Sequence, residues 1–258
     1  MDRRRNDGTL SKVSEAAQIV LLAVAGFVSA AINMVSGGGS FLTLPLFIFL
    51  GLPAGEANAT NRVGVVAQNV AGVLGFHSHG VLDWGFARWV FLPCALGAFL
   101  GSYAALQVGD REFRRVLSVV MVLMALFAVV EPSRFKPATP AARAALLVLG
   151  FLGAGFYGGF IQAGVGFLVL ALTSLLGLDL VRGNAVKVLL VLIQTAVSLA
   201  VFIWAGTIVW KLGLAMAFGC VLGSMAGVRL TVLKGHAWVK RVVTVTIIVF
   251  AVLLWFGA

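Results

Sequence analysis

Polar side chains recur at helical spacing in two otherwise apolar stretches of the chain. In the first, Asn58, Asn61, Val65 and Gln68 stand at i, i+3, i+7 and i+10. On an α-helix these positions lie within roughly 80° of one another, so they share one face. Buried amides need hydrogen-bond partners, so these side chains could join neighbouring helices. They could equally line the path of a polar solute.

The second stretch repeats the pattern and adds a cation. Asn184, Lys187, Val191 and Gln194 have the same spacing. A cation inside a membrane is costly and usually marks a functional site, unless the side chain snorkels to a lipid headgroup. Lys187 therefore favours a path for a charged solute, and Arg62 in the first stretch is a weaker candidate of the same kind.

Glycine-rich breaks precede a short apolar segment in each half. Such breaks free backbone groups, which a membrane tolerates only where protein or water satisfies them. The helix that restarts presents free N–H groups and a positive dipole end, which favour an anion. Close helix packing is the alternative role for the glycines. The candidate donors at the breaks are Gly37, Gly38, Gly39 and Ser40 in the first, and Tyr157, Gln162, Gly164 and Gly166 in the second.

Acidic and catalytic residues are scarce in the apolar segments. Glu56 and Asp179 follow the short segments, and Asp83 begins a longer one. Cation transporters usually place carboxylates in the path, so an anion or a neutral solute is favoured. The sequence has no HExxH, GxSxG or Cys–His motif. We therefore expect no catalytic residue, no metal site and no cofactor.

Composition sets the elements that must position these residues. Of 258 residues, 61% are hydrophobic and 11% are charged, against about 25% charged in a soluble domain. Apolar runs of about 20 residues, enough to span a bilayer, recur along the chain, which predicts an all-α polytopic membrane protein. The first run follows Arg3–Arg5 as a signal peptide would, but it continues into a glycine break and so belongs to the folded unit.

Charge and cysteine usage agree with this class. The net charge is +10, and many of the Lys and Arg residues fall in the short loops 111–115, 134–143 and 234–241. Such positions face water and lipid headgroups, so we expect a bilayer and not nucleic acid as partner. Cys94 and Cys220 lie inside apolar runs and are interpreted as small buried hydrophobes.

An internal duplication organises the chain. A shift of 126 positions superposes scarce residues: Asn58 on Asn184, Gln68 on Gln194, Trp84 on Trp210 and Cys94 on Cys220. We divide the chain into a cytoplasmic tail (1–15), a first membrane repeat (16–131), a linker (132–142) and a second membrane repeat (143–258). The five segments of each repeat are predicted at 16–35, 40–52, 60–77, 85–106 and 113–131, and at 143–161, 166–178, 186–205, 208–230 and 239–257.

The orientation of the two repeats depends on the short second segment. If all five segments change sides the repeats are inverted, and if the short one returns to its own side they are parallel. Loop charge is ambiguous, because 111–115 and 134–143 each carry three Lys or Arg and one span separates them. We favour inverted repeats, because broken helices at matching places are typical of inverted-repeat transporters.

The same residues resemble a known family. Residues 37–46, 57–61 and 80–84, and then 155–167 and 184–187, resemble the two signatures of the TauE/SafE family of sulfite exporters and related anion permeases. The resemblance implies transport of a small sulfur-containing anion such as sulfite or an organosulfonate, and a bacterial-type inner (plasma) membrane location. The first glycine run is shorter than in many members and ends in Ser40, which leaves the anion open.

These observations predict a secondary transporter that binds its anion between the repeats. Specificity is expected where the repeats differ, at Asn61 against Lys187 and at Gly39 against Val165. The alternatives are a transporter of another small solute, a non-transporting scaffold subunit and a passive anion channel. A homodimer is left open as the oligomeric state.

Overall fold

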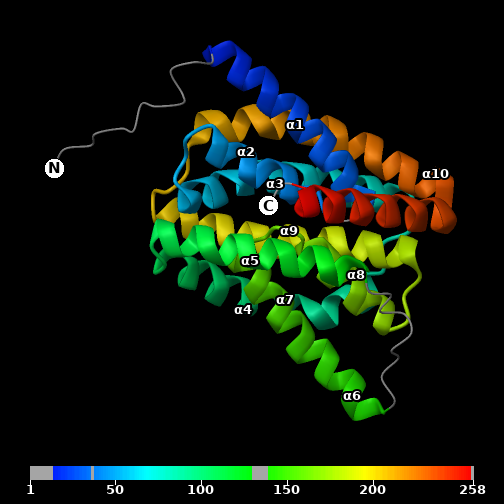
Figure 1. The fold of residues 1–258 in the computed structure, drawn as a ribbon. Helices are drawn as coiled ribbons and strands as arrows, with labels where there is room; N and C mark the ends of the chain where they lie inside the picture. Colours follow the sequence, from blue (N-terminus) through cyan, green and yellow to red (C-terminus); the bar gives the residue numbers. More distant parts are fainter. Residues whose placement is uncertain (1–13, 36–37, 130–138, 257–258) are drawn as a thin grey trace.

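The structure, a computed structural model, describes residues 14–35, 38–129 and 139–256 (Figure 1). Most of the predicted tail and linker, and Gly37, lie outside these residues. Every regular element within the described ranges is helical, which confirms the predicted all-α class. The elements are α1 (Glu15–Val35), α2 (Ser40–Phe49), α3 (Ala54–Ser78), α4 (Trp84–Leu106), α5 (Asp110–Val129), α6 (Pro140–Ala145), the π-helical turn η3 (Leu146–Gly150), α7 (Phe151–Phe160), α8 (Val165–Leu175), α9 (Leu180–Trp204) and α10 (Trp210–Phe256).

Helices cover all ten predicted segments, but several bounds differ: α9, for example, begins at Leu180 instead of 186, and α6, η3 and α7 together cover 143–160. One helix, α10, runs from Trp210 to Phe256 across the two last predicted segments. The third segment begins at Ala54, earlier than predicted, because Pro53 precedes the helix and the Asp110 carboxylate accepts a hydrogen bond from the Ala54 N–H. Within the described ranges five stretches are long and apolar enough to cross a membrane: Glu15–Val35, Trp84–Leu106, Pro140–Phe160, Leu180–Trp204 and Trp210–Lys234.

The short helices α2 and α8 have 10 and 11 residues. At 1.5 Å per residue they rise only about 15–17 Å, against a hydrocarbon core of about 30 Å. Each is followed by a glycine with positive φ, Gly51 at 92° and Gly177 at 96°. Both were predicted to be too short to span, and the structure agrees.

Contacts between helix ends define two faces of the bundle. Lys211 at the start of α10 forms an ion pair with Glu15 at the start of α1. The Val209 N–H, just before α10, donates to Thr60 Oγ1 near the start of α3 (3.0 Å). We call this end the first face. At the other end, the second face, Arg143 of α6 donates to the Leu176 carbonyl oxygen after α8 (3.3 Å).

The halves interlock through close helix pairs. Helix α1 packs along α10, and α7 packs along α4. A Cβ atom at Gly97 would overlap the Leu152 carbonyl oxygen, and one at Gly223 would overlap the Phe27 carbonyl oxygen. These two glycines are 126 positions apart, so matching glycines bring the fourth segment of each half against the first helix of the other half.

Candidate functional site

Helices α3 and α9 form the centre of the molecule. Residues 57–65 of α3 and 183–191 of α9 are buried at every position. The predicted polar stripes therefore lie inside the protein. Their side chains reach several neighbouring helices, and each helix carries one fully buried cation, Arg62 on α3 and Lys187 on α9.

Arg62 binds the C-terminal end of α7 in the opposite half. Its Nη1 donates to the Gly158 carbonyl oxygen (2.5 Å) and to Gln162 Oε1, and its Nη2 donates to the Gly159 carbonyl oxygen (2.8 Å). The guanidinium carbon lies 5.5 Å from the ring centre of Phe202. A cation at a helix C-terminus is stabilised by the carbonyl groups that have no helical partner there.

Lys187 makes the equivalent contact with α1. Its Nζ donates to the Asn33 carbonyl oxygen (2.6 Å), and Asn184 Nδ2 donates to the Met34 carbonyl oxygen. These are the last turns of α1, just before the first glycine break. Lys187 is 1% exposed, so its ammonium does not snorkel to a headgroup.

The two short helices meet at their N-terminal ends. The rings of Phe41 in α2 and Phe167 in α8 stack with centroids 6.3 Å apart, and these residues are 126 positions apart. In the first turn of α2, Thr43 Oγ1 donates to Asn61 Oδ1 (2.7 Å). Two positive helix ends thus point into the centre of the bundle, next to α3.

The second glycine break is held in an unusual backbone conformation. Among the residues that the structure describes, one non-glycine residue has a positive φ, and it is Gln162 (72°). Gly164 follows with φ of 74°. Gln162 Nε2 donates to Thr195 Oγ1 (2.7 Å), and the Tyr157 hydroxyl donates to the Ala163 carbonyl oxygen. A positive φ costs a non-glycine residue about 1 kcal/mol or more, so Gln162 persists there because Arg62 and Thr195 fix its side chain.

The first glycine break is packed against α1. Gly38, Gly39 and Ser40 are buried, and a Cβ atom at Gly39 would overlap the Ser29 carbonyl oxygen. Close packing, the alternative that the sequence left open for these glycines, is therefore present at Gly39. Gly166 is also buried, in the first turn of α8.

Several buried polar atoms have no hydrogen-bond partner among the described residues. They are Asn61 Nδ2, Arg62 Nε, both side-chain polar atoms of Gln68, Asn184 Oδ1 and Gln194 Nε2. Five of the predicted site residues thus keep free hydrogen-bonding capacity in the interior. An unpaired buried polar group costs about 1–3 kcal/mol, which calls for a ligand or water at these atoms.

The electrostatic balance of this centre is positive. Arg62 and Lys187 contribute two charges, while the ends of α1 and α7 offset about half a charge each and the starts of α2 and α8 add about half a charge each. No Asp or Glu is buried in the described part of the chain. A centre with about two uncompensated positive charges therefore favours a bound anion.

Some residues of this centre were not among the predicted site residues. Arg62 was predicted as a weaker candidate than Lys187, although it makes more hydrogen bonds. A signal was available, because Arg62 stands four residues after Asn58 and shares its helix face. No repeated polar spacing pointed to the remaining residues of this centre, which are Thr43, Thr195, Phe202 and the Phe41–Phe167 pair.

Fold and site together define a multi-pass helical membrane protein with broken helices and a cationic interior. Residues 22–254 match the family described as Sulfite exporter TauE/SafE. The chain belongs to this family of membrane transporters, as the sequence resemblance predicted.

Individual relatives cover nearly the same range. The chain is 27% identical to a protein of Haemophilus influenzae described as "Probable membrane transporter protein", over 88% of this chain and 90% of the relative. It is 26% identical to "Probable membrane transporter protein ORF9" of a Sinorhizobium species, over 92% of each. It is also 26% identical to "Probable membrane transporter protein YfcA" of Escherichia coli, over 86% of this chain and 82% of the relative. No solved structure matches the chain.

Proposed function

We propose that this chain is a secondary transporter of a small sulfur-containing anion, such as sulfite or an organosulfonate, in the inner (plasma) membrane. The observation that carries the proposal is the pair Arg62 and Lys187. Both cations are fully buried, and no buried carboxylate is present among the described residues to neutralise them. A sulfonate offers three acceptor oxygens, which suits a site with free amide donors on Asn61, Gln68 and Gln194.

The proposed site lies between the two halves, where α2 and α8 meet. Arg62 and Asn58 approach it from α3, and Lys187 and Asn184 approach it from α9. The cations hold the ends of α1 and α7 in the present conformation, so an arriving anion would compete with backbone carbonyl groups for the same donors. Binding would then be coupled to movement of the broken helices, which transport requires.

The helix-end contacts support the inverted arrangement of the repeats. Helix α1 begins at the first face beside α10, whereas α6 begins at the second face beside the end of α8. In the proposed arrangement, matching helices of the two halves start from opposite ends of the bundle. Inverted repeats offer two equivalent conformations, each open to one side, around a central site.

Transport by purified protein in proteoliposomes tests the proposal. Methanesulfonate and the uncharged dimethyl sulfone are close in size and differ in charge, so we expect flux of the first and not the second. We expect Lys187→Met to reduce anion flux at least tenfold. Lys211→Met is the matched control, because Lys211 is exposed and forms a surface ion pair with Glu15, and this variant should keep its flux.

Two results would contradict the proposal. One is equal flux of dimethyl sulfone and methanesulfonate, which would assign a neutral solute. The other is unchanged anion flux in Lys187→Met at normal expression and thermal stability, which would remove Lys187 from the site.

A further inference from the structure

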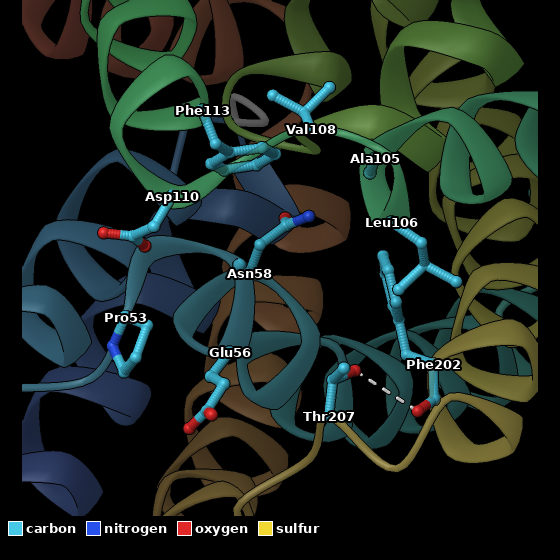
Figure 2. Close-up of a pocket in the computed structure, with 11 residues that line it drawn as sticks. Pro53, Glu56, Asn58, Ala105, Leu106, Val108, Asp110, Phe113, Phe202 and Thr207 are labelled. Atoms are coloured by element: carbon cyan, nitrogen blue, oxygen red, sulfur yellow. Dashed lines mark hydrogen bonds between the residues drawn. The ribbon is translucent and has the colours of Figure 1, made fainter. Parts of the chain in front are cut away.

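A cavity of about 200 Å³ opens at the first face of the bundle. It lies between the start of α3, the end of α4, the start of α5 and the end of α9. Figure 2 shows Asn58 and Glu56 of α3 on one wall, facing Leu106 and Phe202 on the other. Apolar side chains dominate the lining, and the exposed residues Glu56 and Asp110 lie toward the mouth.

Two lining residues connect the cavity to the buried centre. Asn58 Oδ1 lies 3.3 Å from Arg62 Nη2, and the Phe202 ring lies 5.5 Å from the guanidinium carbon. Asn58 is 1% exposed and Phe202 is 2% exposed, so both stand at the inner end of the cavity. A solute in the cavity is therefore one layer of side chains away from Arg62.

The matching positions at the second face belong to an apolar cluster. Under the 126-position shift, Phe202, Leu106 and Thr207 correspond to Phe76, Val232 and Val81. These three residues pack together in one apolar cluster with Met34 and Val188, and Phe76 is 0% exposed. Phe202 and Leu106 also belong to an apolar cluster, but at the first face they line a cavity.

We propose that the cavity is the access vestibule of the transport path, with Phe202 and Asn58 as its floor, and that the Phe76 cluster is the matching vestibule in its closed state. Transport exchanges the two packings: the cluster around Phe76 opens as the walls around Phe202 close. This inference rests on the proposed function only in that the chain moves a solute. The chemical nature of that solute does not enter it.

Physical reasons favour such an exchange. The two gates are phenylalanines at matching positions, so opening one and closing the other changes the total buried apolar area little. The free-energy difference between the two states is then small enough for a solute to shift their populations. At the first face, the side chains of Asn58 and Phe202 separate the cavity from Arg62.

Cysteine accessibility tests the vestibule. Leu106→Cys places a thiol in the cavity, and Val232→Cys is its matched control at the second face. The probe is the membrane-impermeant anion 2-sulfonatoethyl methanethiosulfonate, added to each side of sealed vesicles in turn. The native Cys94 and Cys220 are buried, so the unmodified protein should give no label. We expect Leu106→Cys to react from one side at least tenfold faster than Val232→Cys from either side.

The results separate this inference from the proposed function. Equal labelling of the two variants, or no labelling at Leu106→Cys and at Thr207→Cys, overturns the vestibule whatever solute is moved. Labelling at Leu106→Cys without methanesulfonate flux would support the vestibule and contradict the proposal that the solute is an anion. During turnover we expect the labelling rate at Val232→Cys to rise, and flux without any such rise overturns the exchange.

A second pair of variants tests the floor. Phe202→Leu thins the layer next to Arg62, whereas Phe113→Leu alters a cavity wall residue whose ring packs on Phe160. We expect Phe202→Leu to raise benzenesulfonate flux relative to methanesulfonate flux at least threefold, with no such change in Phe113→Leu. An equal effect of both variants would show that Phe202 is a wall residue and not the gate.

Discussion

Asn58 and Asn184 make the same hydrogen bond from opposite halves of the molecule. Asn58 Nδ2 donates to the carbonyl oxygen of Phe160 at the end of α7 (2.9 Å), and Asn184 Nδ2 donates to that of Met34 at the end of α1. The donors are 126 positions apart, and so are the acceptors. Each half thus supplies the amide that caps the broken helix of the other, and a cation follows each amide on the same helix.

The capping amides give a way to change the central charge with little change in shape. In Asn58→Asp, a carboxylate would lie beside Arg62 Nη2, 3.3 Å away in the native contact, and would cancel one buried positive charge. We expect the apparent affinity for methanesulfonate to fall at least tenfold, as measured by the anion-induced rise in thermal unfolding temperature.

Asn58→Ala is the control for this variant. Both substitutions remove the donor to the Phe160 carbonyl oxygen, so both should lower stability by about 1–3 kcal/mol. Only Asn58→Asp alters the charge. The difference in anion affinity between Asn58→Asp and Asn58→Ala therefore measures the electrostatic contribution to anion binding. Equal affinities would show that the central charge does not hold the anion.

Gln68 carries free hydrogen-bonding atoms in the apolar interior. Neither its Oε1 nor its Nε2 has a partner among the described residues. We expect Gln68→Leu to raise the unfolding temperature of the anion-free protein, because an unpaired buried amide costs about 1–3 kcal/mol. The same variant should lose part of the stabilisation that methanesulfonate gives. A lower unfolding temperature without anion would mean that water already satisfies this amide.

Much of the fold could be predicted from the sequence. Long apolar runs predicted the helices, and the scarce residues Asn, Gln, Trp and Cys revealed the 126-position shift between the two repeats. The glycine breaks gave the short helices α2 and α8. All three signals are local or periodic, and they need no knowledge of which helices touch.

The site was harder to predict, because its geometry comes from contacts between halves. Arg62 meets Gly158, Gly159 and Gln162, all about 100 residues away in the chain. The early start of α3 depends on Asp110, which no hydropathy pattern connects to Ala54. Anion binding by the predicted residues is a prediction that the Asn58, Gln68 and Arg62 variants test.

Two glycines on α7 should respond to alanine in opposite ways. A Cβ atom at Gly158 would overlap Gln194 Oε1, whereas one at Gly153 has nothing within 4 Å. We expect Gly158→Ala to lower the unfolding temperature, because Gln194 is buried and cannot retreat. Gly153→Ala should raise stability by up to about 1 kcal/mol through helix propensity. A stable Gly158→Ala protein would show that the centre around Gln194 is loosely packed.

Arg62 combines a charge with a planar set of donors, and two variants separate these roles. Arg62→Lys keeps the positive charge but cannot reach both Gly158 and Gly159 with the fork geometry of a guanidinium. We expect its unfolding free energy to fall by about 1–3 kcal/mol for each buried acceptor that loses its donor, with anion affinity within a few-fold of native. Arg62→Met removes the charge as well, and should lose anion binding at least tenfold.

The exposed Arg182 provides the control for this pair. Its Nε lies 3.6 Å from Asp179 Oδ2 at the surface, and exposed pairs contribute about 0–1 kcal/mol. Arg182→Met should therefore leave both the unfolding temperature and the anion-induced shift nearly unchanged. If Arg62→Lys and Arg62→Met lose anion binding equally, the positive charge is not what binds the anion. Arg62 would then act by holding the end of α7 in place.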